Sequence, residues 1–233
     1  MNIALVLAGG TGSRLGEKIP KQYIEVAGKP IIAYCLDTFM KHADIDKVQI
    51  VADEMWRSLI RKWVEKEANT KFQGFSVPGE NRQLSIWNGL CDIMHFGQEE
   101  DVVIIHDAAR PLVTERMITD CLDACRKYDG VLSALPVKDT LYLGENGKIM
   151  ELLDRSKLIA GQTPEAFKLG LYYRANEALL PEKILKINGS TEPAVLAGMD
   201  IHCIMGEEQN FKITTREDME RFTQILMING ENE

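Results

Sequence analysis

A short apolar run followed by glycines and two cations carries the most informative chemistry of the chain. The run Ile3–Ala8 leads directly into Gly9-Gly10-Thr11-Gly12-Ser13-Arg14, and Pro20-Lys21 follows shortly after. Glycines after a strand let the backbone turn tightly, and they let its N–H groups approach a phosphate with no side chain in the way. Arg14 and Lys21 add the positive charge that a triphosphate requires. The segment predicts a phosphate-binding loop, and the alternative is a plain glycine-rich turn with two solvated cations.

Two common nucleotide-binding loops do not fit this spacing. A Walker A loop has a longer interval between its glycines and ends in Gly-Lys-Ser/Thr. The dinucleotide pattern Gly-x-Gly-x-x-Gly is nearly met by Gly10, Gly12 and Gly16, but the third glycine is displaced. No isolated acidic residue closes a second strand in the ribose-binding position. An NAD-dependent oxidoreductase stays as an alternative, which nicotinamide binding and independence of Mg²⁺ would reveal.

A carboxylate follows a later apolar run, in the motif His106-Asp107-Ala108-Ala109-Arg110-Pro111. Mg²⁺ prefers one or two carboxylates together with phosphate oxygens and water, so Asp107 is the expected magnesium ligand. An N-cap or an ion pair with Arg110 is the alternative role for this carboxylate. His106 is expected to pack at the end of the strand and not to act as a base.

Further polar side chains follow other predicted strands. Gly79 permits close backbone approach and Arg82 can reach an anion, while Ser85 lies one turn into the next helix. This loop is therefore a candidate base-recognition pocket. Other candidates lie in Val137-Lys138-Asp139-Thr140, Asp154-Arg155, Gln162-Thr163-Pro164 and Lys212-Ile213-Thr214. Each cation alone would be an ordinary surface charge, but their gathering at one sheet edge favours an anion site.

The inventory of reactive groups points to chemistry at phosphorus. Neither a Ser-His-Asp nor a Cys-His arrangement is evident. Glycines, Arg, Lys, one well-placed Asp and hydroxyls suit displacement at phosphorus, where positioning and charge neutralisation do most of the work. The residues indicate nucleotidyl or phosphoryl transfer with Mg²⁺ and leave the base and the acceptor open. A non-catalytic nucleotide-binding module is the alternative, and it would tolerate the loss of Arg14 and Lys21.

Alternating apolar runs and helical periods predict the scaffold that positions these groups. Predicted strands span 2–8, 47–52, 72–77, 101–106, 130–136, 200–205 and 210–213, and predicted helices span 30–42, 54–67, 82–94, 114–128, 167–180 and 215–227. N-caps are expected at Asp53, Asn81, Thr114 and Thr215. This alternation predicts an α/β fold, a doubly wound, mostly parallel sheet with helices on both faces. The loops after the first, third, fourth and fifth strands should build the site.

The segment from Asp139 to Gln162 breaks the alternation. Leu141–Leu143, a turn containing Asn146-Gly147, and Ile149–Leu153 indicate a β-hairpin. We expect a β-arm over about 139–162 that projects from a single domain covering residues 1–233. The arm would serve as a local flap, or it would meet the arm of a second copy and form a dimer.

Composition bounds the partners and the compartment. The 233 residues carry a net charge of −8, which disfavours nucleic-acid binding because nucleic-acid-binding proteins have a basic footprint. No apolar stretch approaches the ~20 residues of a membrane span, and the N-terminal strand leaves no room for a signal peptide. A cytoplasmic location is the expectation. The 5 cysteines lack paired metal spacing and fit free thiols, with Cys121 and Cys125 on one buried helix face.

The ordered motifs resemble those of the 2-C-methyl-D-erythritol 4-phosphate cytidylyltransferase / ribitol-5-phosphate cytidylyltransferase family, over residues 2–227. The motifs that carry the resemblance are Ala8–Arg14, Pro20-Lys21-Gln22, Gly79–Arg82 with Ser85, His106–Pro111, Val137–Thr140, Asp154-Arg155, Gln162–Pro164 and Lys212–Thr214. The resemblance implies a Rossmann-like nucleotidyltransferase. It also implies Mg²⁺-dependent transfer of a cytidylyl group from CTP to a small polyol phosphate, with release of pyrophosphate.

The resemblance also implies roles for individual residues. Arg14 and Lys21 would be catalytic, stabilising the charge that develops at the α-phosphate. The implied nucleotide-binding residues are Ala8, Gly9, Gly10, Thr11, Gly12, Gly79, Arg82, Ser85 and Ala108. The implied acceptor-binding residues are Asp107, Thr140, Arg155, Thr163 and Lys212, with Asp107 also holding Mg²⁺. In such enzymes the arm crosses to the partner subunit, so the resemblance implies a homodimer with a shared acceptor site.

Two acceptors fit the motifs to different degrees. His106–Pro111, the short interval from Arg14 to Lys21, and Ser85–Leu90 are more like the methylerythritol type, which is favoured. Gly161–Pro164 is more like the ribitol type. The first acceptor would place the enzyme in isoprenoid precursor synthesis, and the second in the synthesis of polyol-phosphate polymers or capsules.

Overall fold

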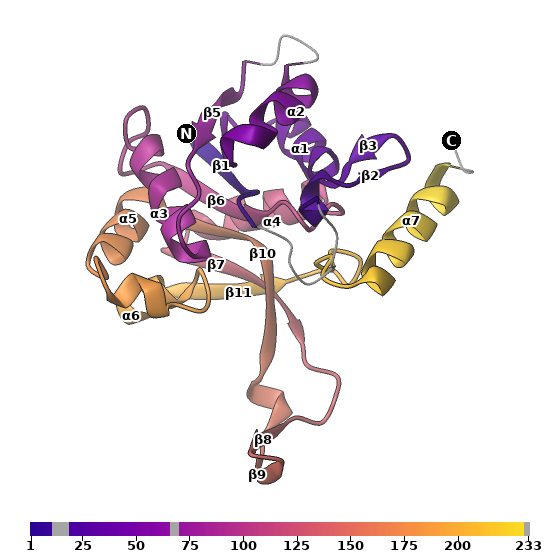
Figure 1. Cartoon of the computed structure of the whole chain (residues 1–233). Coiled ribbons are helices and arrows are strands. Elements are labelled where there is room, and N and C mark those ends of the chain that lie inside the picture. Colours follow the sequence, from indigo (N-terminus) through magenta and orange to yellow (C-terminus); the bar gives the residue numbers. More distant parts are fainter. Residues whose placement is uncertain (11–18, 66–69, 231–233) are drawn as a thin grey trace.

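A seven-stranded, mostly parallel sheet forms the centre of the described part of the molecule, and helices cover both of its faces (Figure 1). The computed structural model describes residues 1–10, 19–65 and 70–230. The strand order is β11-β7-β10-β6-β1-β4-β5. Only β10 runs against its neighbours, β6 and β7. The architecture confirms the predicted doubly wound α/β fold.

The elements have the following bounds. The strands of the central sheet are β1 (Asn2–Leu7), β4 (Lys47–Val51), β5 (Phe72–Ser76), β6 (Val102–Asp107), β7 (Gly130–Pro136), β10 (Ile159–Lys168) and β11 (Ile201–Met205). The helices are α1 (Ile31–Lys41), α2 (Glu54–Val64), α3 (Arg82–Ile93), α4 (Glu115–Cys125), α5 (Leu169–Glu177), α6 (Glu192–Leu196) and α7 (Arg216–Gly230). Two small hairpins pair β2 (Glu25–Val26) with β3 (Lys29–Pro30), and β8 (Tyr142–Glu145) with β9 (Lys148–Leu152). Short 3-10 turns are η2 (Lys21–Tyr23), η3 (Arg155–Lys157) and η4 (Lys183–Lys186).

Side-chain alternation along β1 divides the core between the two faces of the sheet. Ala4 and Val6 pack with residues of α1, α2 and α4. Ile3 and Leu5 point the other way and pack with α3, α5 and α6. Successive residues of a strand face opposite sides, so a strand covered on both faces must be apolar throughout. Gly89 lets α3 pack closely on β1, because a Cβ there would lie 2.5 Å from Leu5 Cδ1.

Three of the four expected helix caps are confirmed. Asn81 Oδ1 accepts a hydrogen bond from Leu84 N at 2.7 Å. Thr114 Oγ1 and Thr215 Oγ1 do the same at the starts of α4 and α7, accepting from backbone N–H groups at 3.3 and 3.2 Å. Asp53 occupies the N-cap position of α2, but its side chain makes no capping hydrogen bond.

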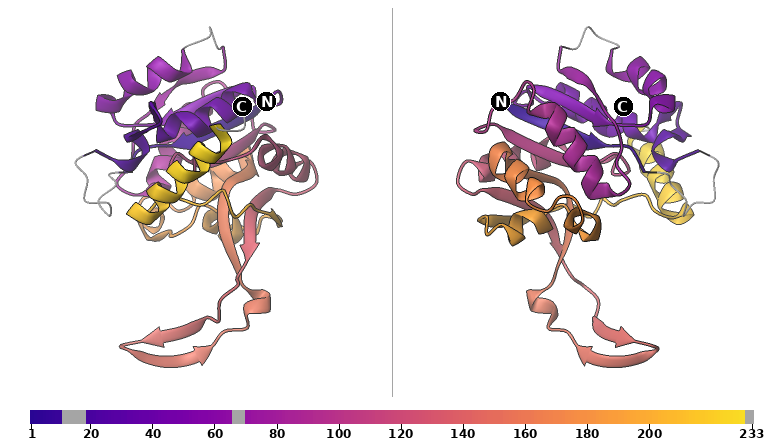
Figure 2. Two further views of the ribbon diagram at one scale, coloured as in Figure 1. Left: turned by 90° about the vertical axis from the view of Figure 1, so that its right-hand side faces the viewer. Right: turned by 60° about the vertical axis from the view of Figure 1, so that its left-hand side comes forward.

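The β-arm projects from the body as a narrow ribbon (Figure 2). Its turn is built as the Asn-Gly pair predicts, since Asn146 and Gly147 have φ of 48° and 78°, both left-handed. Large apolar side chains of the arm are exposed, among them Tyr142, Leu143, Ile149, Met150 and Leu152. No partner within the described chain covers them.

Two expectations about elements are wrong. Residues 210–213 form no strand, and Lys212 lies in an irregular segment between β11 and α7. The strand β10 was not predicted, and α5 begins only after it, at Leu169. Among the described residues, no helix has both the length and the apolar character needed to cross a bilayer.

Candidate functional site

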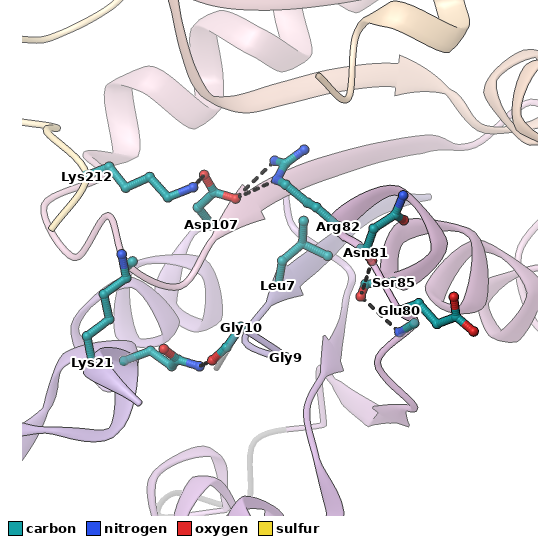
Figure 3. A pocket seen from close by; sticks show the side chains of 13 residues that line it. Leu7, Gly9, Gly10, Lys21, Glu80, Asn81, Arg82, Ser85, Asp107 and Lys212 are labelled. Carbon is teal, nitrogen blue, oxygen red and sulfur yellow. Dashed lines mark hydrogen bonds and ion pairs between the residues drawn. The ribbon is translucent and has the colours of Figure 1, made fainter. Parts of the chain in front are cut away.

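A cavity of about 390 Å³ opens at the carboxyl ends of β1 and β6 and beside the start of α3 (Figure 3). Its lining residues are Leu7, Gly9, Gly10, Lys21, Gln22, Gly79, Glu80, Asn81, Arg82, Ser85, Asp107, Ala109 and Lys212. The loops after β1, β5 and β6 contribute, as expected for a doubly wound sheet. The loop after β7, residues 137–140, does not line this cavity.

The glycine loop after β1 is held from below by η2. Gln22 Nε2 donates to Ala8 O at 2.6 Å and to Gly10 O at 2.7 Å, and Tyr23 OH donates to Ala8 O at 2.8 Å. A Cβ on Gly10 would meet no atom of the described residues within 4 Å. These contacts turn the loop toward the cavity, where Lys21 also lies. The expected site residues Thr11, Gly12 and Arg14 lie outside the described residues.

Glycine is required where the first loop meets the loop after β5. A Cβ on Gly9 would lie 2.6 Å from Pro78 Cβ, and a Cβ on Gly79 would lie 2.3 Å from Leu84 Cβ. Ser85 Oγ accepts from Gly79 N at 3.0 Å and donates to Asn81 O at 2.9 Å. The Ser85 hydroxyl therefore closes its own loop.

Asp107 is the centre of a cluster of charges at the end of β6. Its Oδ1 accepts from Arg82 Nε at 3.0 Å, and its Oδ2 accepts from Lys212 Nζ at 2.8 Å (Figure 3). Arg110 Nε lies 4.0 Å from Oδ2. Burial acts to raise the pKa of Asp107, but the positive charges of Arg82, Lys212 and Arg110 outweigh it and hold that pKa far below its usual range. Asp107 is ionised at every physiological pH and forms hydrogen-bonded ion pairs with the side chains of Arg82 and Lys212.

This donor set does not fit a magnesium ion held by the protein. Both carboxylate oxygens of Asp107 already accept from cationic groups. Within the described ranges, no group of three or more His, Cys, Asp or Glu side chains is placed to hold a metal. The geometry favours the alternative role of Asp107, an ion pair, with Arg82 and Lys212 as its hydrogen-bonded partners. A magnesium ion that is coordinated by the phosphates of a nucleotide would not need a set of protein ligands.

His106 and Thr163 form a buried network behind Asp107. His106 Nε2 lies 3.0 Å from Arg110 O, so this nitrogen carries the proton, and Nδ1 accepts from Thr163 Oγ1 at 3.3 Å. Thr163 Oγ1 also accepts from Asp107 N at 3.0 Å. Burial lowers the pKa of His106 to about 4, so the ring is neutral at pH 7. His106 is structural, as expected, and the Thr163 hydroxyl supports Asp107 from outside the cavity lining.

Glu165 is a buried carboxyl group that sequence reasoning missed. It lies on β10, and its Oε2 has no hydrogen-bond partner among the described residues. Burial raises its pKa to about 6, against the lowering effect of Arg82. Arg82 therefore interacts with two carboxylates, Asp107 and Glu165. No local pattern marks Glu165, because the strand that carries it was itself not predicted.

A single chain brings together only part of the expected site. The structure gathers Gly9, Gly10, Lys21, Gly79, Arg82, Ser85, Asp107 and Lys212 around the cavity. Ala8 and Ala108 are buried behind it, and Ala109 lines it in place of Ala108. Thr140 and Arg155 lie on the exposed arm, where Arg155 Nη1 donates to Lys138 O at 3.0 Å. Gln22 was not expected in the lining, although it follows Lys21 directly.

Comparison with known proteins agrees with this geometry. The family model of 2-C-methyl-D-erythritol 4-phosphate cytidylyltransferase (IspD) matches residues 2–227. A 2-C-methyl-D-erythritol 4-phosphate cytidylyltransferase of Rubrobacter xylanophilus is 38% identical over 222 residues, covering 93% of this chain and 91% of that protein. A ribitol-5-phosphate cytidylyltransferase of Lacticaseibacillus paracasei is 31% identical, covering 97% and 98%. The crystal structure of 4-diphosphocytidyl-2C-methyl-D-erythritol synthase from Anaerococcus prevotii superposes with a TM-score of 0.83 at 25% identity, covering 97% and 96%.

The motif order, the Rossmann-like sheet and the cavity at its carboxyl edge thus agree with full-length matches in both sequence and structure. The chain belongs to the 2-C-methyl-D-erythritol 4-phosphate cytidylyltransferase (IspD) family and is a nucleotidyltransferase enzyme.

Proposed function

We propose that this protein transfers the cytidylyl group of CTP to the phosphate of 2-C-methyl-D-erythritol 4-phosphate, giving the CDP-alcohol and pyrophosphate. The observation that carries the proposal is the two-sided cavity. Gly9, Gly10 and Lys21 lie on one side, and the Arg82–Asp107–Lys212 cluster lies on the other. Such a cavity offers separate positive groups to a triphosphate and to a second phosphate.

The reaction follows from these two groups of cations. An oxygen of the acceptor phosphate attacks the α-phosphorus of CTP in line, and the bond between this phosphorus and the oxygen of the leaving pyrophosphate breaks. Lys21 lies where it can stabilise the charge that develops on the α-phosphate. Lys212 is one-third exposed and held by Asp107, so its ammonium group is oriented toward the cavity before the acceptor arrives. For Arg14, we keep the role that the family resemblance implies, which is to stabilise the charge that develops at the α-phosphate.

Magnesium dependence is part of the proposal, with the ion arriving on the triphosphate. The described side chains do not hold it, because both oxygens of Asp107 are engaged. When bound, the ion would neutralise phosphate charge and so lower the barrier to attack by an anion. The protein's own contribution is to place the phosphates against Lys21 and the glycine loop.

The acceptor is the finer part of the proposal. The favoured acceptor, methylerythritol phosphate, would place the enzyme in isoprenoid precursor synthesis and rests on the family model and on the 38% identity to a methylerythritol-type relative. Ribitol 5-phosphate is the second candidate. It is supported by two relatives of that name at 31% and 32% identity over nearly the whole chain.

We propose further that the active enzyme is a homodimer joined through the arm. Two observations support this. The arm exposes a row of apolar side chains, and it carries Thr140 and Arg155 away from the cavity of its own chain. An arm that reached the cavity of a second copy would bring Arg155 to the acceptor phosphate beside Lys212.

Mixing two variants that are each impaired in acceptor binding tests the shared site, at an acceptor concentration too low for either variant alone to turn over. Arg155→Glu changes the arm, and Lys212→Ala changes the cavity. A mixed dimer would therefore keep one intact site, formed by the cavity of the Arg155→Glu chain and the arm of the Lys212→Ala chain. Equal mixing after dissociation and reassembly should restore about a quarter of the wild-type activity. Two sites that were each complete within one chain would leave the mixture as inactive as its components.

Pyrophosphate release tests the reaction itself. The enzyme is incubated with CTP, Mg²⁺ and either methylerythritol 4-phosphate or ribitol 5-phosphate, with ATP, GTP and UTP as nucleotide controls. Preference for the first acceptor supports the proposal, and preference for the second exchanges the acceptor but keeps the reaction. Release with neither acceptor would contradict the proposed activity, and NAD⁺ binding would then be measured for the oxidoreductase alternative.

A further inference from the structure

The segment 206–213, which carries Lys212, is irregular yet firmly held. It has no helix or strand, so no ladder of backbone hydrogen bonds fixes it. Gly206, Asn210 and Ile213 are nonetheless buried. Backbone bonds anchor its two ends, Gly206 N to Ala134 O at 2.8 Å and Ile213 N to Ala109 O at 2.8 Å. Hydrogen bonds of side chains, both within the segment and outside it, hold what lies between.

The side chain of Gln162, on β10, forms two hydrogen bonds with the beginning of the segment. Its Nε2 donates to Glu207 O at 3.0 Å, and its Oε1 accepts from Glu207 N at 3.2 Å. One buried carboxamide therefore satisfies both backbone groups of one residue, as a neighbouring strand would. The contact is close, because a Cβ on Gly206 would lie 2.5 Å from Gln162 Oε1. This geometry fixes both the position and the orientation of the chain at Glu207.

Thr163, which follows Gln162, binds the segment at Asn210, two residues before Lys212. Asn210 Nδ2 donates to Thr163 O at 2.8 Å, and Arg110 Nη1 donates to Asn210 O at 2.7 Å. Thr163 Oγ1 in turn accepts from Asp107 N, and Asp107 binds Lys212. Adjacent residues of β10 therefore support both partners of the Asp107–Lys212 pair.

We propose that Gln162 is a positioning residue for the phosphate site: through its two bonds to Glu207 it fixes the 206–213 segment on β10 and thereby places the Lys212 ammonium group. The same strand continues into the β-arm through residues 159–161, so the root of the arm and the cavity share one rigid element (Figure 2). Gln162 touches no cavity surface and acts only through Lys212.

Chemical labelling of Lys212 tests the positioning on the protein alone. Gln162→Met keeps the length of the side chain and removes both hydrogen bonds. Acetylation by N-hydroxysuccinimidyl acetate is followed by mass spectrometry, with exposed Lys41 on α1 as the internal reference. We expect the relative rate at Lys212 to rise about tenfold, because two hydrogen bonds that hold the segment are lost.

Gln49→Met is the matched control. Gln49 is also a buried glutamine on a central strand, with its Nε2 donating to Ser76 Oγ at 2.9 Å, and it lies outside the cavity lining. Its substitution should leave Lys212 labelling within about twofold of wild type. An equal rise in both variants, or no rise in Gln162→Met, would overturn the proposal. If Gln162→Met does not fold, Gly206→Ala tests the same contact, because its Cβ would lie 2.5 Å from Gln162 Oε1 and should displace the carboxamide and also raise Lys212 labelling.

Steady-state kinetics test the consequence, and this part rests on the proposed function. Gln162→Met should raise the acceptor KM about tenfold and leave the KM for CTP within about twofold, because Lys212 faces the acceptor phosphate in that function. In a Lys212→Ala background the substitution should have no further effect on the acceptor KM. Additive effects, or equal damage to both substrates, would show a merely structural role. The labelling result stands whether or not the proposed activity is found.

Discussion

Replacing Glu165 by glutamine should stabilise the protein at neutral pH but not at acid pH. Glu165 is buried within β10, and burial raises its pKa from 4.5 to about 6 against the opposing charge of Arg82. Ser190 and Thr191 also face it and lower its pKa, whereas Asp107 raises it. The remaining neighbours in its field are Arg110, Tyr172 and Cys121.

The sign follows from proton linkage. The carboxyl group binds its proton more tightly in the folded protein than in the unfolded chain, so protonation favours the folded state. This contribution is complete below pH 4.5 and is lost as the pH rises through about 6. A difference of one in pKa corresponds to about 1.36 kcal/mol, so the whole contribution of Glu165 is about 2 kcal/mol. More than half of this contribution, about 1 kcal/mol, is lost between about pH 5 and pH 8.

Urea denaturation at pH 5 and pH 8 measures the effect. Glutamine keeps the shape of the side chain without its charge, so the free energy of unfolding of Glu165→Gln, relative to wild type, should rise by about 1 kcal/mol between the two pH values. Other titrating groups are present in both proteins and largely cancel. Glu177→Gln, at the exposed end of α5, is the control and should show no such rise. A difference that is constant or that falls with pH would refute the reasoning, because Glu165 would then be held by a stronger ionic partner.

Three further predictions concern the cavity and the arm. Lys21→Ala should lower kcat by several hundredfold, the scale of one preorganised contact at about 3–4 kcal/mol, and unchanged turnover in steady-state assays would contradict its catalytic role. Asp107→Asn should lower the free energy of unfolding by about 3 kcal/mol in urea, because Arg82 and Lys212 lose their shared partner; a neutral result would mean that the cluster is solvated. Arg155→Glu should raise the acceptor KM and leave CTP affinity by calorimetry nearly intact, and equal loss for both substrates would speak against its acceptor role.

The parallel strands were predictable because strands that are buried on both faces appear in the sequence as short continuous runs of apolar residues. The predicted strands at 2–8 and 101–106 correspond to β1 and β6, each of which contains a run of at least four consecutive apolar residues. The hairpin of the arm was predictable from Asn146-Gly147, since few other residue pairs tolerate two left-handed φ values. Fold class and arm thus follow from local patterns that agree with the global arrangement.

The strand β10 has no continuous apolar run by which it could be predicted. It contains Gly161, Pro164 and the polar residues Gln162, Thr163 and Glu165, and its register against β7 shifts between Gln162 and Glu165. Its polar side chains are buried for their contacts with other segments, and those contacts lie far away in the sequence.

The charge cluster could not be assembled from the sequence for a similar reason. Asp107 binds Arg82, which is 25 residues away, and Lys212, which is 105 residues away. Sequence reasoning placed all three at one edge of the sheet and expected Asp107 to hold Mg²⁺ or to pair with Arg110, but it did not pair Asp107 with Arg82 or Lys212. The pairing depends on the irregular segment 206–213, whose course is set by the amide side chains of Gln162 and Asn210.

The position of the arm in the chain topology has a consequence for how this enzyme can change. Strands β7 and β10 are antiparallel neighbours, with Ile159 opposite Pro136, so the residues between them close one long hairpin. An insertion, deletion or replacement beyond this pair leaves the strand order of the sheet intact, and lengthening a closed loop costs little. The arm is thus a module that can diversify while the cavity is conserved. If copies assemble through the arm as proposed, a change in the arm would alter their pairing and the Arg155 contribution to the shared site together.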